Sequence, residues 1–331
     1  MTKAVVFDRF GEPGDVLDVR DVTPPTPGPG QVRVRMLASP VNPSDLMTVR
    51  GLYGKLPILP ATPGYEGVGV VESAGPGLLG KFYVGKRVAL LNGETGNWQE
   101  LAVTNARQVV PLSDRVPLEQ AAMFFVNPTT AYAMTREVLR VPRGELLVQT
   151  AAASTLGKMV IRLAKLYGFR VLNIVRRQEQ VEELKRLGAD NVLVADAEQI
   201  IDGVRKLTNG EGTRFAIDCV GGATGSALVK SLAPGGRMLV YGTLSGEPLN
   251  FSSRDLMTPC ASIEGFWLAR WMPALSLPRK LKLVRTVGKL LREGVLKSEV
   301  GESFSLDEVK KAVMLAEKTA RGGKVLLRMD R

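Results

Sequence analysis

The chain has 331 residues, 45% hydrophobic and 23% charged, which is the composition of a globular protein long enough for two domains. It contains no histidine and only two cysteines, which excludes a serine–histidine–aspartate triad, a catalytic histidine, a disulfide framework and most zinc sites. The net charge of +11 favours anionic partners such as a nucleotide cofactor, coenzyme A, an acidic carrier protein or nucleic acid.

The first 120 residues are rich in strand patterns. Short apolar runs separated by glycine and proline turns predict strands at residues 4–7, 32–39, 68–73 and 87–91, and helical periodicity is scarce before residues 118–125. The chain opens directly into a strand pattern, and no apolar run approaches the roughly 20 residues of a membrane helix. No basic run interleaved with aromatic residues appears. We therefore expect a cytoplasmic protein with neither a membrane nor a nucleic-acid partner.

Residues 145–177 are the stretch around which the rest is organised. A helical pattern at 127–139 leads into a short apolar strand, a loop of small and hydroxyl residues, a helix that Gly168 ends, and a second strand at 169–175. A unit of this kind seats a pyrophosphate at its first turn. We therefore expect a dinucleotide site here.

The glycine signature of that turn is degenerate. Residues 152–157 read Ala-Ala-Ser-Thr-Leu-Gly, so only Gly157 of the usual G-x-G-x-x-G remains, and Ser154 equally suits an ordinary helix cap. Arg176 and Arg177 follow the second strand, where NAD sites usually place an acidic residue that holds the ribose diol. A basic pair suits a 2′-phosphate instead, although a solvated charge pair is the alternative. We interpret the stretch as an NADPH site.

Strands and helices then alternate strictly, which predicts a parallel sheet covered on both faces. The expected strands are 191–195, 214–220, 237–241 and 262–268, and the expected helices are 178–187, 199–207 and 223–232. An amphipathic helix at 278–292, a helix at 306–316 and a strand at 324–329 do not continue the alternation. We expect these last elements to return to the first domain.

Several motifs together resemble the medium-chain dehydrogenase/reductase superfamily over nearly the whole chain. They are VNPSD at 41–45, RGLYGKLPILPATPGYEGVG at 50–69 and GNWQELA at 96–102, with the nucleotide unit behind them. Zinc-dependent members carry a cysteine where Asn42 stands and a histidine where Tyr65 stands, so the chain resembles the zinc-independent branch and we expect no metal. The resemblance implies an α/β fold, with a GroES-like catalytic domain at 1–125 and 272–331 and a doubly wound Rossmann domain at 126–271.

Finer motifs resemble the mitochondrial-type 2-enoyl thioester reductases of that branch, above all Gly265-Phe-Trp-Leu268 followed by Trp271. The resemblance implies that Tyr53 is the proton donor, and Thr155 and Ala153 depart from the family pattern. Cofactor contacts are implied for Asn42, Asn127, Thr130, Ser154, Thr155, Leu156, Gly157, Arg176, Arg177, Tyr241, Gly242, Thr243, Leu244, Phe266, Trp267, Leu268 and Lys324. A substrate pocket is implied for Tyr53, Phe266, Trp267 and Trp271.

The residue chemistry is compatible with these roles. Reduction of a double bond conjugated to a thioester needs a hydride at Cβ and a proton at Cα, and a tyrosine with an ordinary pKa near 10 stays protonated at neutral pH. Glycines flank Tyr53, which favours a presented side chain, although a loop aromatic covering the core is the alternative. Asp45 and Glu66 could form an acid/base pair, and we favour structural carboxylates. The aromatic residues at 266–271 could equally be core.

Lys282, Arg285, Lys289 and Arg292 lie along one face of the helix predicted at 278–292. They form either a solvated face or a binding surface for coenzyme A phosphates or an acidic carrier protein. We therefore expect an NADPH-dependent trans-2-enoyl thioester reductase of fatty-acid metabolism, acting on a coenzyme A or carrier-protein substrate. The family resemblance adds a homodimer paired at residues 262–268. The alternatives are an NADPH quinone or enone reductase and a non-catalytic NADPH-binding protein.

Overall fold

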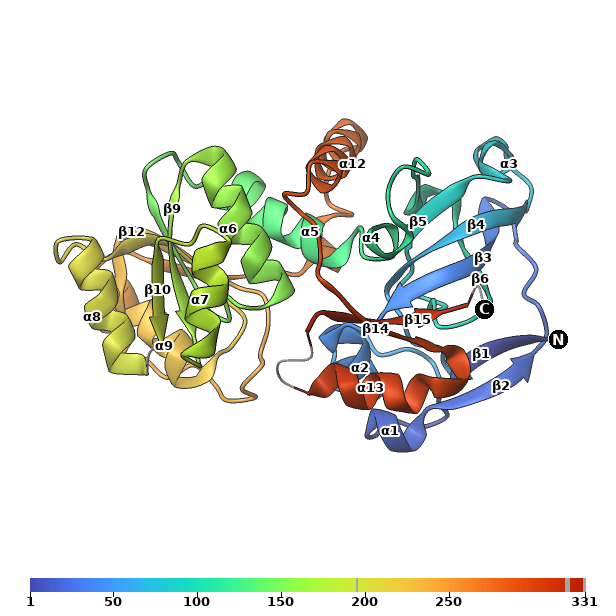
Figure 1. Cartoon of the computed structure of the whole chain (residues 1–331), viewed down its shortest axis with the longest axis horizontal. Coiled ribbons are helices and arrows are strands. Elements are labelled where there is room, and N and C mark those ends of the chain that lie inside the picture. The colour runs from blue at the N-terminus through green and yellow to red at the C-terminus, as the bar shows by residue number, and fades with distance from the viewer. Residues whose placement is uncertain (195, 319–321, 330–331) are drawn as a thin grey trace. The chain divides into compact units, whose positions relative to one another are not determined.

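The computed structural model describes residues 1–194, 196–318 and 322–329 and divides the chain into two compact units (Figure 1). The first unit is Met1–Val126 with Lys297–Arg331, and the second is Asn127–Leu296. The chain thus returns to the first unit at Lys297 rather than at residue 272. The segment before Lys297 stays with the second unit because Arg279 pairs with Glu137 at 3.0 Å and the Arg162 guanidinium donates to the Val295 carbonyl.

The first unit is built on a mixed sheet. Its strand order is β14-β15-β3-β4-β5-β7, and β6 pairs with β3. Val32, Val34 and Met36 alternate inward along β3 with no exposed surface, as a half-buried strand requires. The strands are β1 (Thr2–Val6), β2 (Asp18–Val22), β3 (Gln31–Pro40), β4 (Glu66–Ala74), β5 (Arg87–Leu91), β6 (Leu101–Asn105), β7 (Val109–Pro111), β14 (Val300–Ser305) and β15 (Lys324–Arg328). The helices are α1 (Pro13–Val16), α2 (Pro43–Val49), α3 (Leu78–Tyr83), α4 (Leu118–Ala122) and α13 (Val309–Glu317), with 3₁₀ turns η1 (Ala106–Gln108) and η3 (Leu306–Glu308).

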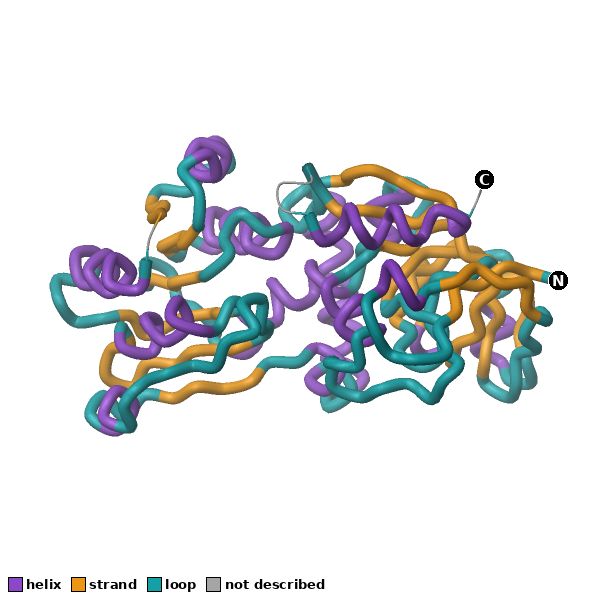
Figure 2. Tube along the Cα trace, turned by 90° about the horizontal axis from the view of Figure 1, so that it is seen from below, coloured by secondary structure: helices purple, strands orange, loops and turns teal. Residues whose placement is uncertain are grey.

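The second unit is a six-stranded parallel sheet with helices on both faces, and Figure 2 marks its strands and helices by colour. The order β10-β9-β8-β11-β12-β13 corresponds to 3-2-1-4-5-6 within the unit, the dinucleotide-binding order. The strands are β8 (Leu146–Gln149), β9 (Arg170–Val175), β10 (Asn191–Val194), β11 (Thr213–Asp218), β12 (Leu232–Val240) and β13 (Ser262–Gly265). The helices are α5 (Val126–Tyr132), the π-helix η2 (Ala133–Val138), α6 (Thr155–Tyr167), α7 (Glu179–Arg186), α8 (Ala197–Leu207), α9 (Gly222–Lys230), α10 (Arg254–Met257), α11 (Leu268–Trp271) and α12 (Leu277–Arg292).

The expected α/β fold class is therefore confirmed, and several local expectations change. The strand expected at 262–268 ends at Gly265, and Leu268 begins α11. The helix expected at 127–139 changes to π geometry at residue 133, where the Thr135 hydroxyl bonds back to the Ala131 carbonyl oxygen. Ala195, the expected last residue of one strand, lies outside the described residues. Three helices of the first unit that had not been predicted, α1, α2 and α3, lie before residue 118.

Helix α2 is short but strongly capped. Asn42 precedes it, Pro43 occupies its first turn, and the Asp45 carboxylate accepts the Asn42 backbone N–H at 2.7 Å. Proline is favoured at the start of a helix because its missing N–H would have no partner there. This cap holds Asn42, Asp45 and Thr48 in place within about two turns of helix.

Candidate active site

The nucleotide site predicted for the second unit lies at the carboxyl end of β8. The Ser154 hydroxyl caps α6 by accepting the Gly157 N–H at 3.1 Å, and the other N–H groups of the first turn have no acceptor within the helix itself. A Cβ added to Gly157 would lie 2.4 Å from the Ala152 carbonyl oxygen, which only glycine avoids. The surviving glycine is therefore needed for the loop at residues 152–157, and the helix start offers N–H donors to an anion.

The arginine pair lies immediately after β9, as the sequence predicted. The Arg176 and Arg177 backbone N–H groups both donate to Gln180 Oε1 at 3.3 Å, which fixes the turn into α7. Arg176 is exposed and Arg177 is half-buried. Among the described residues, no carboxylate forms an ion pair with either guanidinium, so the two cations remain accessible to a phosphate.

The centre of the parallel sheet carries a buried polar network that sequence reasoning missed. The Thr150 hydroxyl donates to Asp218 Oδ1 at 2.5 Å and joins the carboxyl ends of β8 and β11, where the strand order reverses. The Val220 and Gly221 N–H groups also donate to the Asp218 carboxylate, at 3.0 and 2.9 Å. Ligands of doubly wound sheets bind at this reversal point. Asp218 therefore shapes the loop that would face a bound cofactor.

The predicted residues 241–244 pack onto that loop. The Tyr241 N–H donates to the Asp218 carbonyl oxygen at 2.8 Å, and the Leu244 N–H donates to the Cys219 carbonyl oxygen at 2.9 Å. A Cβ on Gly242 would lie 2.9 Å from Cys219 Cβ, so glycine permits this approach. Burial raises the pKa of the Cys219 thiol to about 11 and that of Tyr241 well above its ordinary value, so both groups stay protonated.

The aromatic residues beyond the sheet form a compact group. The Phe266 N–H continues the ladder to the Val240 carbonyl oxygen at 2.8 Å, and its ring centroid lies 5.7 Å from that of Trp271. Arg270 lies over the Trp267 ring at 5.5 Å. Phe266 and Leu268 are buried, and on α5 Thr130 is buried while Asn127 is partly exposed. The second unit thus contains the predicted nucleotide and aromatic residues, and the first contains Asn42, Tyr53 and Lys324.

In the first unit, Asn42 and Lys324 form one buried network with Glu66. The Lys324 ammonium donates to Asn42 Oδ1, and the Asn42 amide donates to Glu66 Oε1 at 3.0 Å. The other carboxylate oxygen of Glu66 accepts the N–H groups of Phe125 and Val126, at 2.9 and 2.8 Å. All three side chains of the network are at most 3% exposed. Burial raises the pKa of Glu66, whereas these hydrogen bonds and the Lys324 charge favour its ionised form.

Asp45 adds a second buried carboxyl to this region. Its Oδ2 accepts the Asn42 N–H and its Oδ1 accepts the Tyr65 N–H at 2.9 Å. Burial raises the pKa of Asp45 to about 7, and Lys324 is the nearby cation that opposes this shift. Both carboxyls hold backbone segments in place, which agrees with the structural role favoured from the sequence.

Two tyrosines lie together beside this network. The Tyr53 and Tyr65 ring centroids are 5.5 Å apart, with the ring planes tilted by 54°. The Thr48 hydroxyl donates its proton to the Ser44 carbonyl oxygen at 2.9 Å, so in its 2.7 Å contact with Tyr65 it must act as the acceptor. Burial raises the pKa of Tyr65 to about 12. Tyr65 is therefore a protonated phenol whose hydrogen is committed to Thr48.

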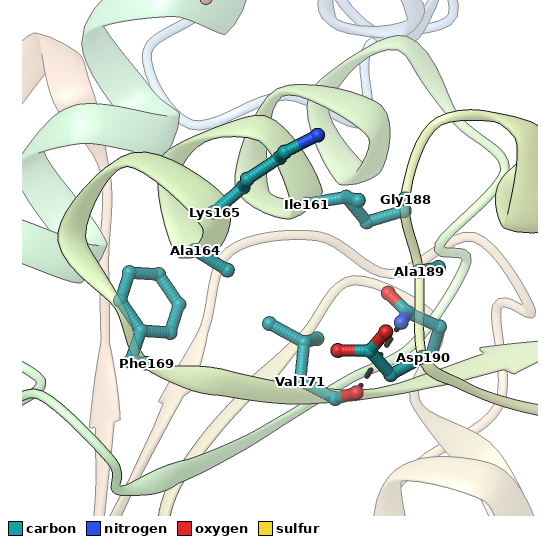
Figure 3. A pocket seen from close by; sticks show the side chains of 9 residues that line it. Ile161, Ala164, Lys165, Phe169, Val171, Gly188, Ala189 and Asp190 are labelled. Atoms are coloured by element: carbon teal, nitrogen blue, oxygen red, sulfur yellow. Dashed lines mark hydrogen bonds between the residues drawn. The ribbon is translucent and has the colours of Figure 1, made fainter.

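The cavity drawn in Figure 3 belongs to another part of the second unit. It has a volume of about 260 Å³ and lies among α6, the start of β9 and residues 188–190. Val171 lines it near the amino end of β9, whereas the arginine pair follows the carboxyl end of the same strand. Asn173 in its wall is fully bonded, because its amide nitrogen donates to the Asn191 carbonyl and its oxygen accepts from Gln149. We assign this cavity no part in the candidate site.

No three cysteine, aspartate or glutamate side chains gather as a set of metal ligands in the parts of the chain that the structure describes. Across the same parts, none of the helices combines the length and the apolar character needed to cross a bilayer.

Two families of known proteins match this chain, one in each of the two units. Residues 28–114 match the family model of the alcohol dehydrogenase GroES-like domain, and residues 155–298 match that of the zinc-binding dehydrogenase. The mitochondrial enoyl-[acyl-carrier-protein] reductase of Bos taurus is 34% identical over 298 residues, which are 89% of this chain and 80% of that protein.

Two solved structures extend the comparison. A quinone oxidoreductase of Pseudomonas syringae is 30% identical with a TM-score of 0.89, covering 99% of this chain and all of the other. A mycobacterial protein solved in complex with NADPH is 28% identical with a TM-score of 0.88 and the same coverage.

The first unit does not fit the zinc ion that one matching family model implies. Asn42 and Tyr65 stand where the zinc-dependent proteins carry a cysteine and a histidine. Both the oxygen and the nitrogen of the Asn42 amide already form hydrogen bonds. The Lys324 ammonium also places a positive charge beside the Glu66 carboxylate. A metal would have to displace this cation and would find no thiolate or imidazole ligand. We therefore derive no chemistry through a metal.

Proposed function

Because the chain belongs to the zinc-independent branch of the medium-chain dehydrogenase/reductase superfamily, we propose that it reduces the C=C bond of trans-2-enoyl thioesters with NADPH. The protein is an oxidoreductase, and we propose the acyl thioester as its specific substrate. The name of the Bos taurus relative supports a thioester held on a carrier protein.

NADPH binding is assigned to the carboxyl edge of the parallel sheet. The Ser154-capped start of α6 offers N–H donors to the pyrophosphate, and Arg176 with Arg177 offers two cations to the 2′-phosphate. When bound, the cofactor supplies the hydride. The Asp218 network keeps the loop at residues 219–222 in place beside it. The NADPH complex of the mycobacterial relative supports this choice of cofactor.

Tyr53 is the proton donor in this proposal, and the tyrosine pair is the observation that supports it most directly. Hydride addition at Cβ leaves negative charge on the thioester oxygen and Cα, and a proton must reach Cα. Tyr65 gives its hydrogen to Thr48, and we assign the task to Tyr53, whose ring centroid lies 5.5 Å from that of Tyr65. The residues flanking Tyr53, Leu52 and Gly54, are exposed, whereas Tyr53 itself is half-buried and its ring packs on Tyr65.

Replacement of Tyr53 by phenylalanine tests the assignment. We expect turnover of crotonyl thioesters to fall by about 100-fold or more, while NADPH affinity is kept. The matched control is Tyr83→Phe, which removes a phenol from α3 and leaves turnover unchanged. Unchanged turnover in Tyr53→Phe would refute the assignment of Tyr53 as the proton donor.

A second candidate function is the reduction of quinones or enones, which the name of the Pseudomonas syringae relative supports. Quinones accept a hydride readily and need no dedicated acid, so Tyr53→Phe would leave their turnover unchanged. A panel of enoyl-coenzyme A, enoyl-carrier, enone and quinone acceptors with the wild-type protein decides between the two. Tight NADPH binding without turnover of any acceptor would favour the third alternative, a non-catalytic nucleotide-binding protein.

A further inference from the structure

Helix α12 (Leu277–Arg292) carries a face of positive charge that is compensated, among the described residues, at only one position, Lys289. Lys282, Arg285, Lys289 and Arg292, here called the α12 basic face, are all exposed. At 3.6 residues per turn they fall within about 80° of arc and extend over about 15 Å. The opposite side of the helix, including Leu283, Val287, Leu290 and Leu291, is buried. The charge is therefore concentrated on the side that faces solvent.

Local acidic groups do not neutralise this face. The sequence from Leu277 to Arg292 contains six cations and no acidic residue. Glu293 lies 3.8 Å from Lys289, and among the described residues no carboxylate comes within ion-pair distance of Lys282, Arg285 or Arg292. By contrast, α7 (Glu179–Arg186) carries three glutamates followed by two cations, and its Lys185 pairs with Glu182 at 3.1 Å. Four like charges on one arc repel one another, so the face gains from an anionic partner.

The surroundings of the face favour a protein over the other anionic partners. Leu277 and Leu281, one turn apart at the start of α12, are 68% and 48% exposed and lie beside the cations. Exposed leucines next to cations suit a protein interface, in which apolar contacts supply most of the affinity. A membrane-bound helix would insert its apolar face, and here that face is buried. The phosphates of a single coenzyme A all belong to one nucleotide, so they would contact only part of a basic face about 15 Å long.

We infer that the α12 basic face docks an acidic surface of the acyl carrier protein that delivers the thioester. This inference rests on the proposed function for the identity of the partner. Charges arranged in this way act mainly by steering encounter and fixing orientation, and their effect weakens with added salt.

The test combines a charge reversal with three forms of the same acyl group. The variant is Lys282→Glu with Arg285→Glu and Lys289→Glu. The matched control reverses three exposed cations of the same unit, Arg205 and Lys206 on α8 and Lys230 on α9. The substrates are crotonyl-loaded acyl carrier protein, crotonyl-coenzyme A and crotonyl-N-acetylcysteamine, of which the last has neither protein nor nucleotide.

We expect the α12 variant to raise KM for the carrier-bound substrate by about tenfold or more at low salt, with kcat unchanged. KM for the two small thioesters should stay within about twofold, and the control variant should behave as wild type. An equal rise for crotonyl-coenzyme A would assign the face to phosphates and overturn the inference. An unchanged KM for the carrier-bound substrate would overturn it as well.

Direct binding separates this inference from the proposed reaction. Crotonyl-loaded carrier protein immobilised on a surface reports affinity without turnover. Binding that the α12 variant loses and the control keeps supports the docking face even if no thioester is reduced. Loss of binding to anionic vesicles or to RNA in the variant, with carrier binding unchanged, would overturn the inference in favour of that partner.

Discussion

The buried carboxyl of Asp45 makes a quantitative prediction about stability and pH. Asp45 and Glu66 lie near one buried cation, Lys324, and a single ammonium cannot balance two carboxylates. Burial raises the pKa of Asp45 to about 7, although it accepts the N–H groups of Asn42 and Tyr65. Asp45→Asn imitates the neutral acid and is the informative change.

The sign of the effect follows from proton binding. Because the pKa of Asp45 in the folded protein lies above its ordinary value of 3.8, the folded state binds this proton more tightly than the unfolded chain does. The contribution of this proton to the free energy of unfolding is fully present below about pH 4 and is lost as the pH rises to 7. The whole difference corresponds to about 4 kcal/mol, of which about 3 kcal/mol falls above pH 4.5.

Urea unfolding across a pH series measures this difference. We expect the stability of the wild type relative to Asp45→Asn to fall by about 3 kcal/mol between pH 4.5 and pH 8. Thr48→Val, which removes a neutral hydroxyl from the same helix, is the control and should differ from wild type by a constant amount. If the gap between wild type and Asp45→Asn stays within about 0.5 kcal/mol over the series, the reasoning about this carboxyl is wrong.

Three further changes test the nucleotide loop and the buried cation. Alanine at both Arg176 and Arg177 should lower the ratio of kcat/KM for NADPH to that for NADH by about tenfold or more, and a wild type that already prefers NADH contradicts the assignment. Gly157→Ala places a methyl group against the Ala152 carbonyl oxygen, so we expect weaker NADPH binding by fluorescence titration and a loss of about 1–3 kcal/mol in unfolding; unchanged affinity would show that the loop tolerates the side chain. Lys324→Met leaves a buried carboxylate without its cation and should cost about 3 kcal/mol or more in urea unfolding, whereas an unchanged midpoint would show that the lysine is not its counter-charge.

The parallel sheet was predictable because its signal is local. Strands β8 and β9 are buried along nearly their whole length, so they read as continuous apolar runs, and each helix between strands begins or ends at a recognisable residue. Ser154 and Gly168 cap α6 at its two ends as the sequence predicted. The change to π geometry after Tyr132 was not predictable in this way, because the periods of π and α turns differ too little over six residues.

Helix α2 was missed although its signal is present in the sequence. Asn42-Pro43 followed by Asp45 is a capped helix start, with proline in the first turn and a carboxylate that returns to the cap. The helix has only seven residues, too few for apolar periodicity to show. Thr150 and Asp218 were missed for a different reason, since 68 residues separate the two sides of their hydrogen bond.

Lys324 is the clearest case in which neighbouring residues in the sequence do not predict the environment of a side chain. As the first residue of β15, a lysine before Val-Leu-Leu suggests an exposed strand end, yet its side chain is 3% exposed and bonds to Asn42, 282 positions earlier. The antiparallel pairing of β15 with β3 brings the end of the chain to the start of α2. A buried ammonium is tolerable only beside acceptors and carboxylates, which are supplied here by Asn42 and Glu66. The network therefore depends on sheet pairing, and the same pairing places a cation beside Glu66, in a site without a thiolate or imidazole ligand for zinc.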